Sequence, residues 1–280
     1  MLAVPTAAEP AAAPAPSPAM WVVRGAGSEI TLFGSVHELP AATVWLSPPI
    51  AARFDAADTL VLETIVPTDP AAIGALLRGF GGADKAKPLL VRIGPERARQ
   101  LTKAATDLGL PVAALGSSKT WLAALTIAGI AASRDGLSTE NGVEATLTLR
   151  AAAAHKPVVG LERPAEQLGY FDALPEADQQ ALLGTILDEL PSAAADTKAL
   201  VASWLAGRPE DINADKELHA SPALERALLI NRNARWADWI AGVLRHPGKV
   251  FVAVGAAHLT GENSVQAMLA KRGLVVERLQ

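Results

Sequence analysis

Cysteine is absent from all 280 residues, and this absence excludes disulfide bonds, thiolate metal ligands and a cysteine nucleophile. The sequence also has no dense block of lysine and arginine, and its formal net charge is -4. Neither a nucleic-acid-binding stripe nor a polybasic patch for a membrane surface is therefore expected. We expect a peptide or small-molecule substrate instead.

Long apolar runs are also missing. The longest one, around Trp121 to Ala132, is too short to cross a membrane, so we interpret it as a buried helix and predict no membrane span. Residues 1–20 are rich in alanine and proline and are expected to form a flexible leader. They lack the basic start and apolar run of a signal peptide. Because such tracts often follow a removed export signal, we expect a periplasmic or cell-envelope location.

Several familiar catalytic motifs do not occur. The chain has no G-x-S-x-G elbow, no phosphate-binding glycine loop and no dinucleotide fingerprint. His37-Glu38 begins like the zinc-protease motif H-E-x-x-H, but Pro40 and Ala41 end the match. Ser35 lies near His37, yet no sequence pattern makes it a nucleophile. Catalysis, if present, must use a different arrangement.

The remaining patterns predict one α/β domain over residues 21–280. Short apolar runs predict strands at 21–24, 29–33, 59–63, 156–161, 250–254 and 274–278, the first two forming a hairpin. Helices are predicted at 41–56, 95–108, 142–155, 175–207, 222–244 and 264–272. Short buried strands separated by helices indicate a central, mainly parallel sheet flanked by helices, with a helical insertion over residues 70–150.

Four polar side chains stand at the ends of predicted strands, namely His37, Glu63, Glu162 and His258. In open α/β sheets, ligands bind outside the carboxyl ends of the strands, so we expect these side chains to converge there. Both histidines end a G-x-x-H segment, and a glycine permits an abrupt turn off the strand. Two such segments, each after a buried strand, are far more specific than one.

Imidazole and carboxylate groups are ligands for Zn, Mn, Fe and Co, and a bound ion lowers the pKa of water from about 15.7 towards about 7. The pattern therefore indicates hydrolysis. Arg232 lies on the apolar stripe of the helix predicted at 222–244, where a guanidinium needs a carboxylate or an anionic substrate group. Asn233 beside it is expected to orient a ligand or donate to an oxyanion.

Several segments together resemble the TraB/GumN/PrgY family, over about residues 21–278. They are LFGSVH ending at His37, ADTLVLE ending at Glu63, GLE ending at Glu162 with Glu166-Gln167, Arg232-Asn233 with Trp236, and VAVGAAHL around His258. The family is similar to the Tiki metalloproteases and, more distantly, to erythromycin esterases and ChaN-like haem-binding proteins. The resemblance implies a TraB/ChaN/EreA-like α/β fold and a metal-dependent peptidase or related hydrolase.

The resemblance also implies roles for individual residues. His37 and His258 would be metal ligands, or a ligand and a base, and Glu63 a ligand or the general base. Glu162 would be a further candidate ligand for the metal ion, which would be Mn, Co or Zn. Together with Arg232 and Asn233, Glu162 would also support the site or bind substrate. One departure is Glu144, where an aspartate is expected at a helix start, and we assign it no role.

Other interpretations remain open at the level of sequence. The two histidines are also compatible with hydrogen bonds to backbone carbonyls, Glu162 with a helix-dipole contact, and Arg232 with a purely structural bridge. Two further functions stand beside the metallohydrolase. One is a non-catalytic envelope protein that binds haem or a metabolite, and the other is a metal-free esterase of the erythromycin-esterase type.

Overall fold

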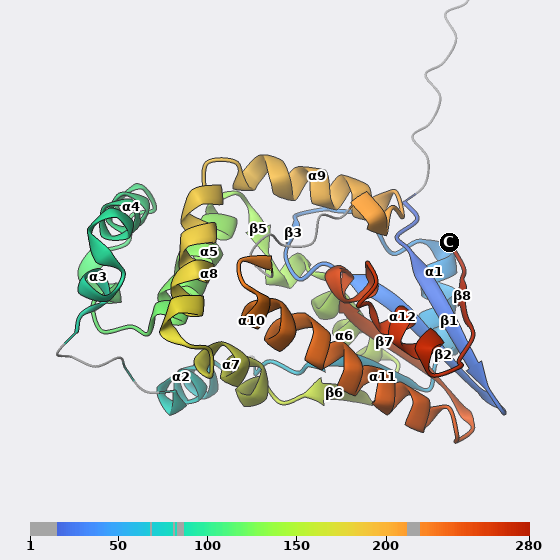
Figure 1. Ribbon diagram of the computed structural model, residues 1–280. Helices are drawn as coiled ribbons and strands as arrows, with labels where there is room; N and C mark the ends of the chain where they lie inside the picture. The colour runs from blue at the N-terminus through green and yellow to red at the C-terminus, as the bar shows by residue number, and fades with distance from the viewer. Residues whose placement is uncertain (1–15, 68, 81, 83–86, 212–218) are drawn as a thin grey trace, which may run out of the picture.

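The computed structural model describes residues 16–67, 69–80, 82, 87–211 and 219–280 (Figure 1). It confirms the predicted α/β class. A six-stranded sheet has the strand order β6-β4-β7-β2-β1-β8, and a separate pair is formed by β3 and β5. The strands are β1 Met20–Gly25, β2 Ser28–Ser35, β3 Leu39–Pro40, β4 Thr59–Thr64, β5 Leu137–Ser138, β6 Val158–Glu162, β7 Gly248–Gly255 and β8 Val276–Arg278.

Four neighbouring strands of the sheet run parallel, and this direction decides where the site lies. β7 pairs in parallel with both β2 and β4, and β4 pairs in parallel with β6. The carboxyl ends of all four therefore meet at one edge, as the sequence predicts. β1 pairs antiparallel with β2 in the predicted hairpin, and β8 closes the other side of the sheet.

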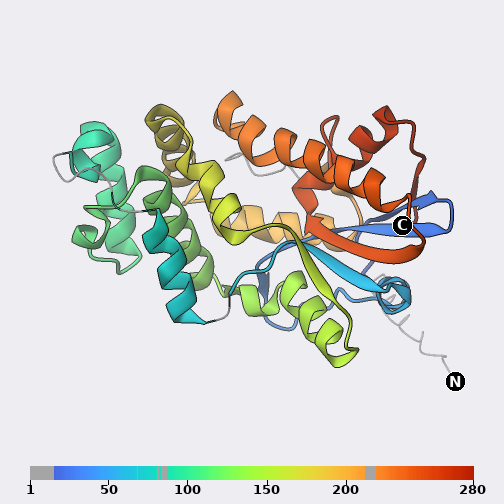
Figure 2. The same ribbon diagram turned by 90° about the horizontal axis from the view of Figure 1, so that it is seen from below.

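Alternating side chains of the strands supply two separate apolar cores, one on each face of the sheet. Leu60, Leu62 and Phe251 face a core covered by α1 Pro48–Ala56, α6 Val143–Ala153 and α9 Ala193–Leu205. Val61 and Val252 face the opposite core, covered by α11 Asn231–Val243 and α12 Val265–Lys271. Figure 2 shows helices on both sides of the sheet.

A helical lobe stands beside the sheet and has its own apolar core (Figures 1 and 2). Its helices are α2 Pro70–Gly79, α3 Leu89–Arg92, α4 Gly94–Asp107, α5 Thr120–Arg134 and α8 Glu176–Glu189, with α7 Pro164–Asp172 leading into α8. The predicted helical insertion is thus present, but its residues differ from the predicted range 70–150. α6 packs on the sheet, and α8 from further along the chain completes the lobe.

Three predicted helices have different bounds in the structure. The helix predicted at 41–56 begins only at Pro48, because Pro48 and Pro49 fit the first turn of a helix but not its interior. The helix predicted at 175–207 is divided into α8 and α9, with Pro191 between them. The helix predicted at 222–244 contains α10 Pro222–Glu225, a π-helical turn at Arg226–Ile230, and then α11.

The chain before the sheet is partly tied to the domain. Residues 1–15 of the predicted leader lie outside the described residues, whereas Met20 is already a buried member of β1. The Ser17 N–H donates to the Leu205 carbonyl over 2.8 Å. In the described part of the chain, no helix has the length and apolar character needed to cross a membrane.

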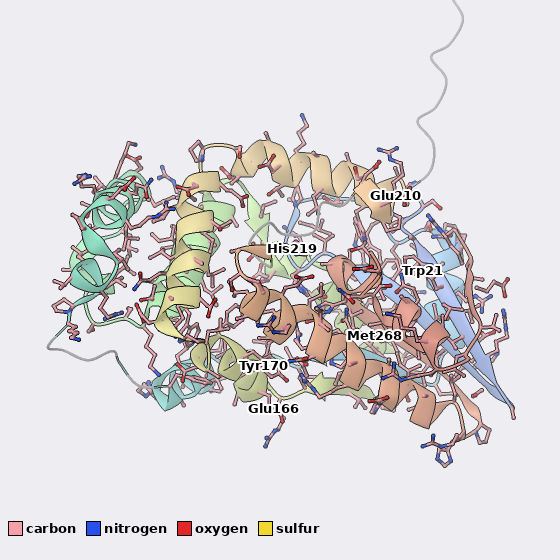
Figure 3. All side chains as sticks on the ribbon, in the orientation of Figure 1. Trp21, Glu166, Tyr170, Glu210, His219 and Met268 are labelled. Atoms are coloured by element: carbon pink, nitrogen blue, oxygen red, sulfur yellow. The ribbon has the colours of Figure 1, made fainter. Side chains whose placement is uncertain are left out.

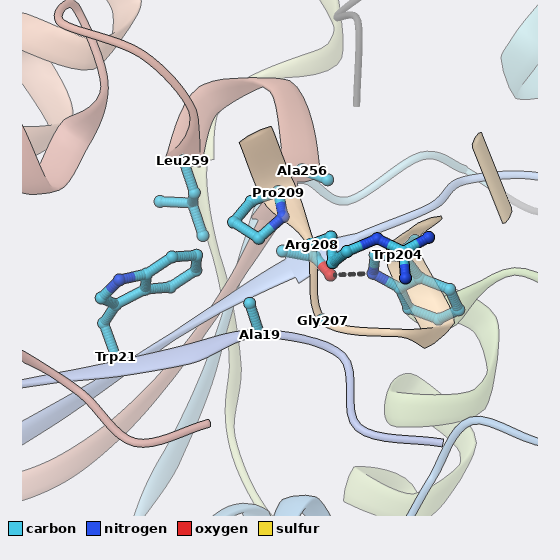
Figure 4. Close-up of a pocket in the computed structure, with 9 residues that line it drawn as sticks. Ala19, Trp21, Trp204, Gly207, Arg208, Pro209, Ala256 and Leu259 are labelled. Atoms are coloured by element: carbon cyan, nitrogen blue, oxygen red, sulfur yellow. Dashed lines mark hydrogen bonds between the residues drawn. The ribbon is translucent and has the colours of Figure 1, made fainter. Parts of the chain in front are cut away.

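Trp204 fixes the end of β2 next to the candidate site. Its indole Nε1 donates to the Gly34 carbonyl over 2.8 Å, beside a small cavity (Figure 4). The Trp204 ring also packs against Phe33 and Trp45 in the first core. The Gly34 carbonyl that Trp204 holds lies three residues before His37.

Candidate functional site

The four predicted side chains lie at the carboxyl edge of the parallel strands. His37 follows β2, Glu63 is the penultimate residue of β4, and Glu162 is the last residue of β6. His258 follows β7 in the 3-10 turn Ala256–Leu259. Glu63, Glu162 and His258 are buried, whereas the His37 side chain is 57% exposed. The site is therefore built from a buried polar group with one solvent-facing histidine.

Gly255 marks the point around which three of these side chains converge. A Cβ atom placed on Gly255 would lie 3.1 Å from Glu63 Oε1, 3.4 Å from His37 Nε2 and 3.6 Å from His258 Cδ2. The Gly255 N–H also donates to Glu63 Oε1 over 2.7 Å. A larger residue would crowd the three groups, so the glycine of this G-x-x-H segment leaves the space in which they meet.

Arg232 holds the buried part of the site together. Its Nη2 donates to Glu63 Oε2 over 2.6 Å, and its Nε donates to the carboxylate of Glu162 over 3.0 and 3.1 Å. Its Nη1 donates to the Leu228 carbonyl over 3.0 Å and contacts His258 Nε2 at 3.1 Å. The carboxylate partners expected for this inward-facing arginine are thus Glu63 and Glu162, and every guanidinium nitrogen has an acceptor.

The neighbours of His258 determine its tautomer. Asn233 Nδ2 donates to the Asn263 carbonyl, so Asn233 Oδ1 faces His258 Nδ1, at 2.5 Å, as an acceptor. Nδ1 therefore carries the proton, and Nε2 accepts from Arg232, which has only donors to offer. The ring also packs on Trp236 with centroids 4.4 Å apart. Asn233 thus orients the His258 ring.

Burial and charge set the protonation states of the inner groups. Burial lowers the pKa of His258 to about 3, against an opposing effect from Glu63, so its imidazole is neutral at ordinary pH. Burial acts to raise the pKa of the Glu63 carboxyl, but the Arg232 guanidinium and the Gly255 N–H lower it well below its usual range. Glu63 is therefore ionised beside a neutral His258.

A pH titration of stability tests this assignment of His258. The pKa is about 6.5 in the unfolded chain and about 3 in the folded one, so stability is full above pH 6.5 and falls as the pH drops below it. We expect the free energy of unfolding of metal-free protein to fall by about 2 kcal/mol from this group between pH 7.5 and pH 5.

Urea unfolding at the two pH values measures the effect. In the variant His258→Gln this contribution must disappear, because glutamine does not titrate. An equal pH dependence in the variant and the wild type would show that His258 is not held neutral by the fold.

Glu144 is a site residue that the sequence analysis missed. Its Oε1 lies 2.8 Å from His37 Nδ1 and 2.5 Å from Ser35 Oγ. Burial acts to raise the pKa of Glu144, but its contact with His37 and the hydrogen bond from Ser35 lower it. The ionised carboxylate accepts from His37 Nδ1 and so leaves Nε2 facing Glu63. Because Ser35 contacts the carboxylate, the arrangement is not that of a serine nucleophile activated by histidine.

The sequence around Glu144 indicates a constrained helix start, but it does not show which residue Glu144 contacts. Gly142 lets the start of α6 approach the chain at His37, because a Cβ there would lie only 2.0 Å from the His37 carbonyl oxygen. The Val143 N–H donates to the Val36 carbonyl over 3.1 Å. The glycine followed two residues later by an acid indicated a constrained helix start, but its partner lies 107 residues earlier.

Glu162 is surrounded by donors from α7 and α11. Its Oε1 accepts from Trp236 Nε1 at 3.2 Å, from Tyr170 Oη at 3.3 Å and from Arg235 Nη2 at 3.3 Å, in addition to Arg232. Figure 3 shows Tyr170 and Glu166 on α7 beside the helix that carries the two arginines. These contacts hold the Glu162 carboxylate in a fixed position, and Glu162 in turn positions Arg232. Trp236 does more than pack, because it also donates to Glu162.

Imidazole nitrogens and carboxylate oxygens are suitable metal ligands, but those of His258 and Glu63 already have hydrogen-bond partners. Within the described residues, no group of three or more His, Asp or Glu side chains has the arrangement of a metal site. Arg232 contacts His258 Nε2 and one oxygen of Glu63, and Gln167 Nε2 donates to the same oxygen over 3.1 Å. His37 Nε2 and Glu63 Oε1 still lie beside Gly255, with Cδ2 as the nearest atom of the His258 ring, and His258 Nε2 lies 3.6 Å from Glu63 Oε1.

Comparisons with known proteins agree with the family that the motifs resemble. The chain is 26% identical over 252 residues to "Uncharacterized protein YbaP" of Escherichia coli (strain K12), covering 90% of this chain and 92% of the relative. It is 27% identical over 238 residues to "Uncharacterized protein YbaP" of Shigella flexneri, covering 85% and 86%. No solved structure matches. The TraB/PrgY/gumN family profile matches residues 19–278, and the chain therefore belongs to the TraB/PrgY/gumN family.

Proposed function

We propose that this protein is a hydrolase, and that His37, His258 and Glu63 activate water for attack on the carbonyl of a peptide substrate. The observation that carries the proposal is the convergence of an ionised carboxylate and two imidazoles around Gly255. Such a set at the carboxyl edge of a parallel sheet occupies the usual position of an α/β active site.

The residues divide the work according to their surroundings. Glu144 accepts from His37 Nδ1 and so orients the ring, which places Nε2 on the side of Glu63 and within reach of solvent. Without a bound ion, we assign proton transfer to His37 Nε2 together with Glu63; with an ion bound, His37 Nε2 would be a ligand and the ion would lower the pKa of water instead. Asn233 and Arg232 position the neutral His258, and Glu162 positions Arg232. A general base in this position contributes about a hundred- to ten-thousand-fold in rate.

We further propose that His37, His258 and Glu63 hold a divalent metal ion such as Mn, Co or Zn. Both imidazoles direct Nδ1 to a side-chain acceptor, which is the outer-sphere arrangement that orients histidine ligands. When bound, such an ion supplies Lewis acidity that polarises a carbonyl and lowers the pKa of water. Binding has to replace the contact between Arg232 and His258 Nε2. Glu162 stays with its four donors and is left out of the ligand set.

Metal removal tests this part of the proposal. We expect a chelator to abolish peptide hydrolysis and Mn, Co or Zn to restore it. At a hundred times its Kd, the ion is expected to raise the free energy of unfolding by about 2.7 kcal/mol, because it binds only the folded chain. Denaturation of apo protein with and without each ion measures the shift.

A matched pair of variants gives the control. His258→Ala is expected to show neither restoration nor stabilisation by metal, whereas His246→Ala, at an exposed site after α11, is expected to behave like the wild type. Equal stabilisation of His258→Ala and wild type would contradict the assigned ligands.

A metal-free hydrolase is the second candidate, and one observation favours it. Arg232 already contacts His258 Nε2, and the pair formed by Glu144 and His37 resembles the carboxylate and histidine of general-base enzymes. Ester hydrolysis that survives exhaustive chelation but is lost in His37→Ala would establish this candidate and exclude the metal.

A further inference from the structure

A hollow of about 290 Å³ lies beside the site and has no part in the chemistry described above. Its volume is close to the lower end of the range of ligand pockets, roughly 300–1,000 Å³. The loop after β3 forms one wall, and the turn before α6 with the first part of α6 forms the other. The lining includes Thr43, Val44, Trp45, Glu140, Asn141 and Thr146.

The walls of the hollow belong to the same segments that carry the site. Asn141 Nδ2 donates to the Leu39 carbonyl over 3.3 Å, so the two walls are tied to each other. One wall continues from His37 through Leu39, and the other continues into Glu144, which contacts the His37 ring. Pro40 follows His37 by three residues, a span of at most about 10 Å in extended chain. A peptide held at His37 therefore reaches the hollow within two or three residues.

The charge of the lining selects what the hollow can hold. Glu140 is its only charged side chain, and in the described part of the chain no basic side chain forms an ion pair with it. The Thr43 and Thr146 hydroxyls and the Asn141 amide add polar contacts, and Val44 and Trp45 add apolar surface. An aliphatic stem that ends in a cation complements this lining, whereas a carboxylate at the same place is repelled by Glu140.

Backbone strain occurs in the same wall. Ala42 has a φ of +60° in the turn closed by the Thr43 N–H and the Pro40 carbonyl, 3.3 Å apart. Glycine is the usual residue at this left-handed turn position, so alanine stores strain there. Strain of this kind is typical of functional sites.

We propose that this hollow is a substrate subsite that receives a lysine or arginine side chain two or three residues from the bond cleaved at His37. The inference rests on the proposed peptide hydrolysis and adds to it a preference for basic peptides. Glu140 contacts the cation at the exposed end, and Thr146 and the segment 43–46 contact the stem.

Kinetics on matched peptides test the subsite. The assay uses a set of peptides that carry lysine, glycine or glutamate at each position around the cleaved bond in turn. The wild type and Glu140→Lys are compared on this set. We expect the wild type to prefer lysine over glycine by up to about fivefold in kcat/KM at one position, as for an exposed ion pair. Glu140→Lys is expected to reverse the preference towards glutamate.

Two further variants separate charge from shape. Thr146→Trp fills the hollow and is expected to raise KM for lysine peptides while kcat is retained. Glu96→Lys makes the same change of charge in the first turn of α4, in the helical lobe, and is expected to keep the wild-type preference. A change of preference in Glu96→Lys equal to that in Glu140→Lys would assign the effect to net charge and overturn the proposal.

Binding of labelled peptides to His37→Ala distinguishes failure of the subsite from failure of the proposed function. Fluorescence anisotropy is expected to give tighter binding for the lysine peptide than for the glutamate peptide, and this difference must be lost in the double variant with Glu140→Lys. Hydrolysis without this charge preference would overturn the subsite and leave the hydrolase intact. Binding preference without hydrolysis by wild type would support the pocket and refute the hydrolase.

Discussion

Replacing Arg232 by methionine is expected to lower the free energy of unfolding by about 3–5 kcal/mol, because the change leaves buried carboxylates without their cation. Glu63 and Glu162 are each about 5% exposed and both depend on the same guanidinium. Methionine fills much of the volume but offers no donor. Urea unfolding at pH 7.5 measures the loss.

Two comparisons identify the cause of this loss. Arg235→Met removes a half-exposed arginine from the same Glu162 and is expected to change stability by less than about 1 kcal/mol. Adding Glu63→Gln and Glu162→Gln to Arg232→Met is expected to recover part of the loss, since the uncompensated charges are then gone. Equal effects of the two single arginine variants would contradict the buried network.

Replacing His37 by alanine is expected to lower kcat/KM for peptide hydrolysis by about a hundred- to ten-thousand-fold, the range of a lost general base. Because His37 Nδ1 donates to the ionised Glu144, the free energy of unfolding is also expected to fall, by about 1–3 kcal/mol. Activity assays on protein whose folding has been checked by thermal unfolding make the measurement.

His155→Ala serves as the matched control, since that residue is an exposed histidine after α6. It is expected to keep wild-type activity. A His37→Ala variant that retains a tenth or more of wild-type kcat/KM would remove His37 from the proposed chemistry and would favour a binding protein of the same fold.

The central sheet was predictable because its strands follow local rules. Leu60, Val61 and Leu62 alternate between two apolar cores, and the same alternation holds in β7. Helix ends were less predictable. The start of α1 depended on two consecutive prolines, and the π-helical turn at Arg226–Ile230 has no signal in the hydrophobic pattern of its helix.

The site was predictable to the extent that it depends on strand ends. His37, Glu63, Glu162 and His258 were placed at one edge of the sheet, and the structure has them there. The partners of these side chains were not predictable in the same way. Glu144 was assigned no role, although it contacts His37, and Tyr170 was not considered, although it contacts Glu162.

The sequence by itself determined the kinds of chemical group and their positions at the ends of strands, because hydrophobic alternation and glycine turns act over a few residues. Only the tertiary structure decided which groups touch. Arg232 reaches Glu63 across 169 positions of the chain, and Glu144 reaches His37 across 107. Such contacts depend on how α6 and α11 pack on opposite faces of the sheet, and that packing is a property of the whole folded chain.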